Sequence, residues 1–292
     1  MLRGAFGTML RRMCCHPDCP GATRCELQHS CPYAVLFEPR PPADARVLRN
    51  YQAIPRPFVF RPPLEETTLY EQPFQFGLVL AGKSVAYLPH VAMSFAQLAG
   101  EGFGLNRAKV KLERVEQISP EKLVYDGASE VMHQPDPPSP NPHPPSPEVN
   151  RVAVHFLTPT HLVFQEQTVR EPEFHHLIRR LRDRLNSLAV FYGDGPLDLD
   201  FAGLAERAQA VRCVSRDLRW EDRSRASSKP SKRGQRHSIG GFTGNCVYDG
   251  NLTEFVPLLR LGELGHVGKH AAWGNGWFEI VAEPTLPLSK RH

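Results

Sequence analysis

The stretch "LRLGELGHVGKHAAWGNGWFEI", residues 259–280, joins a helix-like pattern to a strand-like one through a glycine-rich connection. An apolar run with helical spacing leads in, and Trp277-Phe278-Glu279-Ile280 leads out. Five glycines fall within residues 262–276, with basic and aromatic side chains between them. Glycines let another backbone come close, and exposed N–H groups beside a lysine attract phosphate. The stretch therefore predicts a loop that either packs tightly on its own domain or contacts phosphate groups.

The P-loop motif of nucleotide-binding proteins does not fit this stretch. That motif requires a strand before G-x-x-x-x-G-K-[ST]. Here Lys269 is followed by His270, Glu263 stands where the first glycine is required, and a helix-like run precedes the loop. A second glycine-rich segment, "GEGFG" at residues 100–104, also follows a helix-like run and is not G-x-G-x-x-G. The sequence thus excludes both nucleotide-binding motifs.

Length and composition place the chain among globular proteins with a sizeable core. Its 292 residues suffice for one large domain or two ordinary ones, and 41% of them are hydrophobic. No run approaches 18 apolar residues, so we expect no transmembrane helix. The N-terminus lacks a signal-peptide pattern, and five of the seven cysteines lie between residues 14 and 31. We therefore expect a protein of the reducing cytoplasm.

The positive charge is concentrated in one place. "RSRASSKPSKRGQR", residues 223–236, carries six basic residues and no acidic one. Since the whole chain has a net charge of +4, the rest carries −2. Such local basicity is typical of a surface that contacts a polyanion, and a solvated loop is the alternative.

A proline-rich segment predicts the domain boundary. "HQPDPPSPNPHPPSP", residues 133–147, contains eight prolines, which cannot join a helix or a central strand. We therefore expect an N-terminal domain at 1–132 with a cysteine-rich insertion, a linker at 133–150, and a C-terminal domain at 151–292 with the glycine-rich loop. A long surface loop within one domain is the alternative.

The two halves repeat one order of elements. In the first half the patterns predict a helix at 2–13, strands at 57–62 and 73–82, a helix at 86–99 and a strand at 107–118. In the second half they predict strands at 152–165, a helix at 172–193, strands at 210–220 and 242–250, a helix at 252–265 and a last strand from Trp277. This order predicts an α+β fold of two tandem ferredoxin-like (RRM-like) βαββαβ domains, the first without its opening strand.

Four blocks of sequence resemble a known family. They are "GGFTGNCVYDGNLTEFVPLLRLGELGHVGKHAAWGNGWFEI", "LRGAFGTMLRR", the cysteine segment that ends in "CPYAVLFEP", and "LAGEGFGLNRAKVKLERV". In this order they are similar to the CRISPR precursor-RNA-processing endoribonucleases of the RAMP superfamily. The match covers about a hundred residues in both halves, in four blocks that keep the family's order.

The resemblance implies an activity and its partners. It implies two ferredoxin-like folds that bind CRISPR repeat RNA and cleave it without a metal ion. In that reaction the 2′-hydroxyl attacks the neighbouring phosphate and leaves a 2′,3′-cyclic phosphate and a 5′-hydroxyl. Other CRISPR-associated proteins are further expected partners, a membrane is not, and the chain is expected to be a monomer or a homodimer.

The resemblance also selects candidate residues. Relatives take the catalytic base or acid from the first helix or the loop after it, where this chain offers His29, then His16, with Tyr33 nearby. Histidine suits proton transfer because its pKa lies near neutrality. The expected RNA-binding residues are those of the two glycine-rich segments: Gly100, Gly102, Gly104, Arg107, Arg260, Gly265, Gly268, Lys269, His270, Gly274 and Gly276.

The cysteine segment leaves a metal site open. Cys15, Cys19, Cys25 and Cys31 could hold a structural zinc ion or a cluster, but only the Cys15-x₃-Cys19 pair has the spacing that zinc sites prefer. Small buried thiols that pin a loop are the alternative, so we expect no cofactor.

Two other functions compete with the nuclease. One is a non-catalytic guide-RNA-binding RAMP subunit of an interference complex. The expected lack of an opening strand and the presence of Thr8, where relatives often have a histidine, favour it. The other is a zinc-dependent nucleic-acid-binding protein, which depends on the cysteines alone.

Overall fold

The computed structural model describes residues 1–21, 24–41, 54–65, 73–104, 106–137, 148–226 and 236–284. The chain divides into two compact units. The first comprises residues 1–58, 80–143 and 191–194, and the second comprises 59–79, 144–190 and 195–292. Most of the proline-rich segment, residues 138–147, lies outside the described residues. The domain boundaries expected from that segment stay a prediction.

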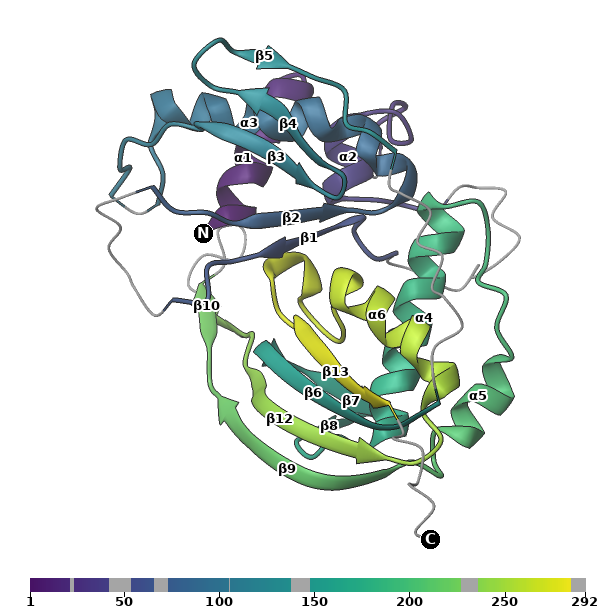
Figure 1. The fold of residues 1–292 in the computed structure, drawn as a ribbon. Coiled ribbons are helices and arrows are strands. Elements are labelled where there is room, and N and C mark those ends of the chain that lie inside the picture. The colour runs from purple at the N-terminus through teal and green to yellow at the C-terminus, as the bar shows by residue number, and fades with distance from the viewer. Residues whose placement is uncertain are drawn as a thin grey trace, which may run out of the picture. The chain divides into compact units, whose positions relative to one another are not determined.

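A four-stranded antiparallel sheet forms the centre of the second unit (Figure 1). Its strands are β6 (Val149–Thr160), β9 (Arg212–Glu221), β12 (Gly241–Asp249) and β13 (Phe278–Pro284). They lie in the order β13-β6-β12-β9, so β12 is inserted between β6 and β9. This order is the split βαβ arrangement of a ferredoxin-like fold, as the element order predicts.

Two helices cover one face of this sheet, α4 (Phe174–Tyr192) and α6 (Val256–Gly265) (Figure 1). Leu177, Ile178 and Leu181 of α4 are fully buried because they recur at the three- and four-residue spacing of a helix face. They share the core with Phe156 and Phe278 of the sheet. A short helix, α5 (Phe201–Arg207), which the sequence patterns do not predict, precedes β9.

Two small hairpins extend the second unit. β7 (Leu162–Phe164) pairs with β8 (Gln167–Val169) across a two-residue turn. The turn residues Gln165 and Glu166 have φ values of 46° and 65°, the positive angles that a type I′ turn requires. β10 (Ser224–Ala226) pairs with β11 (Arg236–Ser238), and residues 227–235 of the basic stretch between them lie outside the described residues.

The first unit contains the helices α1 (Leu2–Cys14), α2 (Pro32–Phe37) and α3 (Leu88–Glu101) and the three-stranded sheet of β3 (Arg114–Ile118), β4 (Glu121–Asp126) and β5 (Val131–Met132). A separate two-stranded sheet pairs β1 (Phe58–Arg61) with β2 (Gly77–Leu80), and residues 59–79 of it belong to the second unit. Along the chain, the succession α1, β1, β2, α3, β3 follows the element order of a βαββαβ motif from its first helix onward, with β1-β2 and β3-β4-β5 in separate sheets. The strand predicted at 107–118 is shorter, since only residues 114–118 pair with β4. The predicted cysteine-rich loop contains α2.

An aromatic cluster joins the helices of the first unit. The Phe6 ring lies 5.0 Å from Phe37, 5.6 Å from Phe58 and 5.6 Å from Phe95, measured between centroids. A β-carbon on Gly7 would lie 2.5 Å from the Phe37 ring, so only glycine lets α2 pack this closely on α1. Phe6 and Gly7 belong to the "LRGAFG" block and Phe37 to the "CPYAVLFEP" block, so these two blocks meet in one core.

None of the described helices is both long and apolar enough to cross a membrane.

Candidate functional site

The glycine-rich segment runs from α6 to β13 and folds back on its own unit. Gly268, Gly274 and Gly276 have φ values of 81°, 97° and 72°, which favour glycine. A β-carbon would lie 2.4 Å from His161 O at Gly268 and 1.8 Å from Val267 O at Gly276. The protein itself therefore fills the space beside these α-carbons. A close approach of RNA to the glycines stays a prediction.

Hydrogen bonds hold this segment against β6. The hydroxyl of Thr158 donates to Gly274 O at 2.7 Å and accepts from Trp277 N at 2.9 Å. Lys269 N donates to His161 O at 2.9 Å. Because its backbone is fixed on both sides, the loop presents Lys269 at a defined position on the surface, where that side chain is exposed.

Histidines in this segment adopt strained backbone angles. His266 and His270 have φ values of 57° and 65°, which residues other than glycine rarely adopt. Arg107, beside the first glycine-rich segment, has a φ of 48°. Such strain persists where the surrounding structure enforces it, and it is concentrated at functional sites.

His266 is a structural residue rather than a proton carrier. Its side chain is 0% exposed, and its Nδ1 lies 3.2 Å from Asn275 O. Burial, together with the charges of Arg184 and Arg61, lowers the pKa of His266 to about 3. The ring is parallel to that of Trp277 at 6.1 Å, and the Arg61 guanidinium lies 5.1 Å from the Trp277 centroid.

Arg260 is engaged within the protein. Its guanidinium donates to both carboxylate oxygens of Glu263, at 3.0 and 3.2 Å, and to Ile280 O at 3.1 Å. Glu263 in turn accepts from Ile280 N at 2.7 Å. These bonds join the end of α6 to β13. Gly265, also expected to contact RNA, is buried, and a β-carbon there would lie 2.7 Å from Leu185.

The first glycine-rich segment forms a tight turn after α3. Phe103 and Ala108 exchange backbone hydrogen bonds of 2.7 and 2.9 Å. Gly102, with a φ of 85°, passes so close to Arg107 that a β-carbon would lie 2.4 Å from Arg107 O. Gly104, at the turn, has a φ of 78°, and Arg107 is exposed. Gly100 has open space beside its α-carbon.

The candidate catalytic residues lie after α1. His16 and His29 are exposed, and His16 Nδ1 accepts from Asp18 N at 3.3 Å. Tyr33 lies on α2 with its ring 5.5 Å from Phe37, and its hydroxyl lies 3.4 Å from Glu38 Oε1. No hydrogen bond or ion pair in the described part of the chain joins any two of the three candidates.

The environment of Tyr33 decides which proton transfer it can perform. Burial and the neighbouring Glu38 raise its pKa to about 12, against the opposing charge of Arg11. The phenol therefore keeps its proton at neutral pH. Tyr33 can donate a hydrogen bond or a proton, but it is a poor general base.

Thiols gather between α1 and α2. Burial raises the pKa of Cys15 to about 12, and Cys31 and Cys19 are its neighbours. Across residues 1–21, 24–41 and the other described ranges, no group of three or more His, Cys, Asp and Glu side chains is arranged to hold a metal ion. All five cysteines between residues 14 and 31 are free thiols of intermediate exposure.

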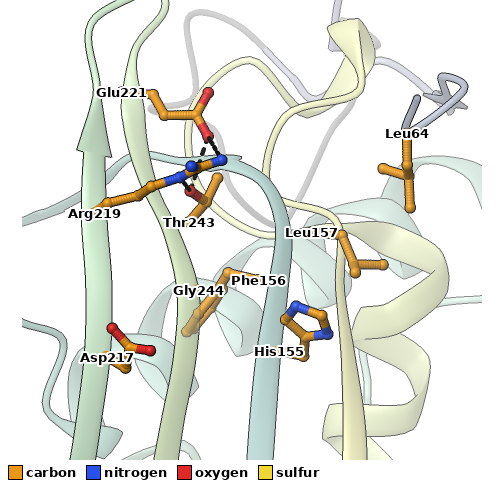
Figure 2. A pocket seen from close by; sticks show the side chains of 9 residues that line it. All are labelled: Leu64, His155, Phe156, Leu157, Asp217, Arg219, Glu221, Thr243 and Gly244. Atoms are coloured by element: carbon orange, nitrogen blue, oxygen red, sulfur yellow. Dashed lines mark hydrogen bonds and ion pairs between the residues drawn. The ribbon is translucent and has the colours of Figure 1, made fainter. Parts of the chain in front are cut away.

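A pocket that no sequence motif indicates lies on the open face of the second unit's sheet (Figure 2). Its volume is about 390 Å³. Thr243 Oγ1 donates to Glu221 Oε1 at 2.8 Å and accepts from Arg219 Nε at 3.3 Å, as the dashed lines in Figure 2 show. Side chains of a strand alternate between its two faces, so the pattern identifies the outward side chains only once the buried face is known. The pocket is lined by Leu64, His155, Phe156, Leu157, Asp217, Arg219, Glu221, Thr243 and Gly244.

Comparisons with known proteins agree with this architecture. Residues 154–278 match the family model of the CRISPR-associated endoribonuclease Cas6, and residues 1–137 match a model described as an N-terminal domain. An uncharacterised protein of Archaeoglobus fulgidus is 27% identical over 290 residues, which cover 95% of this chain and 89% of that protein.

Two solved structures share the fold. Cas6 in a product complex has a TM-score of 0.54 at 16% identity, over 96% of this chain and 92% of that one. Thermus thermophilus Cas6 has a TM-score of 0.50 at 15% identity, over 96% and 90%.

The two solved structures thus show that this chain has the ferredoxin-like fold of Cas6 proteins. The similarity to the CRISPR-associated endoribonuclease Cas6 in sequence thus lies in residues 154–278, the part of the chain that holds most of the ferredoxin-like sheet and the glycine-rich loop.

Substitution of Gly276 tests whether the glycines serve internal packing. Gly276→Ala places a β-carbon against Val267 O at a positive φ, so we expect the free energy of unfolding to fall by at least about 2 kcal/mol. Gly100→Ala is the matched control. It meets nothing within 4 Å in α3 and should raise the stability by up to roughly 1 kcal/mol. Urea unfolding measures both, and equal effects of the two variants would contradict the packing role.

The buried His266 predicts a pH dependence of stability. In the unfolded chain the His266 imidazole takes up a proton below pH 6.5. In the folded chain the same imidazole takes up a proton only near pH 3. His266 therefore reduces the folding equilibrium constant by up to about tenfold for each pH unit between 6.5 and 3, and has no such effect above pH 6.5. His266→Asn tolerates the positive φ and offers an amide donor. Urea unfolding from pH 4 to 7 should show a shallower slope for the variant, and parallel curves would refute the prediction.

Proposed function

We propose that this chain is a metal-independent endoribonuclease that cleaves CRISPR repeat RNA and leaves a 2′,3′-cyclic phosphate and a 5′-hydroxyl. The match of residues 154–278 to the Cas6 family model carries the proposal, because it includes most of the ferredoxin-like sheet and the whole loop around Lys269. CRISPR-associated proteins are further partners under this proposal, which also draws on the product complex of a Cas6 with the same fold.

In the proposed reaction a general base removes the proton of the 2′-hydroxyl. The 2′-oxygen then forms a bond to the adjacent phosphorus while the bond from phosphorus to the 5′-oxygen breaks. A general acid returns a proton to that 5′-oxygen, and cations stabilise the negative charge on the phosphorus oxygens. Atoms and protons balance without a metal ion.

The exposed histidines after α1 are the first candidates for the proton transfers, and His29 is preferred to His16. His16 already accepts a hydrogen bond from Asp18 N, which engages one of its two nitrogens. Tyr33 fits the acid or a hydrogen-bond donor, since its raised pKa keeps the phenol protonated. Lys269 is a cation that can meet a phosphate from a fixed backbone.

Replacement of His29 tests the assignment of the base or acid. His29→Ala should lower the single-turnover cleavage rate by roughly 10²- to 10⁴-fold with little change in RNA affinity. His133→Ala, another exposed histidine of the first unit, is the matched control and should leave the rate unchanged. Equal rates for wild type and His29→Ala would exclude His29. His16→Ala and Tyr33→Phe would then be measured in the same assay.

Replacement of Lys269 tests the loop as a phosphate-binding element. Lys269→Ala should weaken binding of repeat RNA and reduce by about one the slope of log affinity against log salt concentration. Lys122→Ala is the control, because Lys122 already pairs with Asp136 at 2.6 Å. An unchanged slope in Lys269→Ala would remove the loop from the phosphate contacts.

A further inference from the structure

A planar cation and an aromatic ring are stacked at the end of β9. The guanidinium carbon of Arg170, just after β8, lies 4.5 Å from the Trp220 ring centroid. The Trp220 Nε1 donates to Asp222 Oδ1 at 3.0 Å, which fixes the ring's orientation. The edge of His161 approaches the same ring, with centroids 5.9 Å apart and planes inclined by 65°. Arg170 is exposed and Trp220 is half-buried, so the cation forms the outer layer of this stack.

The stack borders a second pocket of the same unit. Its volume is about 320 Å³, at the lower end of the range of small-molecule sites. Leu218 and the buried Phe242 give it apolar walls, and Trp220 gives an aromatic one. The lining residues are Arg170, Glu171, Arg216, Leu218, Arg219, Trp220 and Phe242.

Two of the three arginines that line this pocket form ion pairs, one of them Arg219 with Glu221 at 3.7 Å. Arg216 is held by Glu171 at 2.9 Å and by Glu173 at 2.7 Å. Among the described residues, no carboxylate forms an ion pair with Arg170. The pocket therefore combines one arginine outside these ion pairs with a planar, partly apolar surface. Such surfaces bind unpaired nucleobases, which stack on aromatic rings and on arginine planes.

The stack is continuous with the glycine-rich loop. Lys269 N is bonded to His161 O, and the His161 ring contacts Trp220. Burial and the charge of Lys269 lower the pKa of His161, so the imidazole is neutral at neutral pH. One surface thus carries a cation for phosphate at Lys269 and a stacking layer at Arg170 and Trp220.

We propose that Arg170 and Trp220 form a stacking site for one unpaired base of the RNA whose phosphates meet Lys269. The inference rests on the proposed function, whose substrate it describes more closely. A base lies on the outer plane of the Arg170 guanidinium or enters the pocket beside Trp220. Recognition by stacking tolerates any base, because each has a flat π-face.

A different role for the same pair is a brace that holds the β7–β8 hairpin to β9. A brace affects stability and leaves the dependence of RNA binding on a particular base unchanged. A double-mutant cycle distinguishes the two roles, because it measures whether the loss of affinity on removing an RNA base depends on the protein residue.

The test measures binding of unpaired repeat RNA and of the same RNA with one abasic position at a time. It compares the wild-type chain with Trp220→Leu, which keeps an apolar side chain, and with Arg170→Lys, which keeps the charge but loses the plane. Arg179→Lys is the matched control, since Arg179 lies 5.5 Å from the Phe164 centroid in the same unit. A free nucleoside monophosphate is tested in parallel.

The proposal predicts that one abasic position lowers wild-type affinity by roughly 5- to 100-fold. That loss should disappear in Trp220→Leu and in Arg170→Lys but persist in Arg179→Lys, and Trp220→Leu should keep the wild-type salt dependence. The same abasic loss in all variants would overturn the stacking site and leave the proposed nuclease intact. Saturable binding of the free nucleotide that needs Trp220, without coupling in RNA, would also overturn it. Absence of any repeat-RNA binding or cleavage would remove the proposed function, and this inference with it.

Discussion

The hydroxyl of Thr158 is the interaction on which the glycine-rich segment depends. It donates to Gly274 O and accepts from Trp277 N, so one buried side chain bonds both sides of the turn that leads into β13. The turn closes only because Gly276 passes Val267 O where any β-carbon would overlap it. Side-chain hydrogen bonds inside a protein are strong and costly to lose when one partner is removed. The position of Lys269 at the surface follows from this internal network.

This arrangement separates two tasks that an RNA-binding surface has to perform. Lys269 offers a charge on a backbone that is already ordered, so binding costs little further ordering. Arg170 and Trp220 offer a plane beside two arginines that form ion pairs with carboxylates. Charge contacts weaken with salt, whereas stacking does not, and a surface with both can hold RNA backbone and bases independently.

The sequence predicted the second unit well because its signals are local. Apolar residues recur with a helical period in α4 and form apolar strand patterns in β6 and β12. Each of these patterns reflects one buried face of its element. The short elements α2, α5 and β5 escaped prediction, since few residues define them. The loop's position was predicted, but the sequence left open whether its glycines serve tight packing or phosphate contact. The neighbours of Gly268 and Gly274, which are His161 and Pro62, lie about a hundred or more residues away in sequence. Arg170 and Trp220 are fifty residues apart, so their pairing could only be seen in the folded chain.

The most direct measurement is cleavage of the repeat RNA from the protein's own CRISPR locus by purified chain in excess EDTA. Parallel RNAs would carry a 2′-deoxy substitution at each position, and the ends of the products would be identified. The account predicts cleavage at one site in EDTA, a 2′,3′-cyclic phosphate and a 5′-hydroxyl, and loss of cleavage with a single deoxy substitution. Tight binding without cleavage, or cleavage that EDTA abolishes, would contradict it. The first of these results would favour a subunit that holds guide RNA.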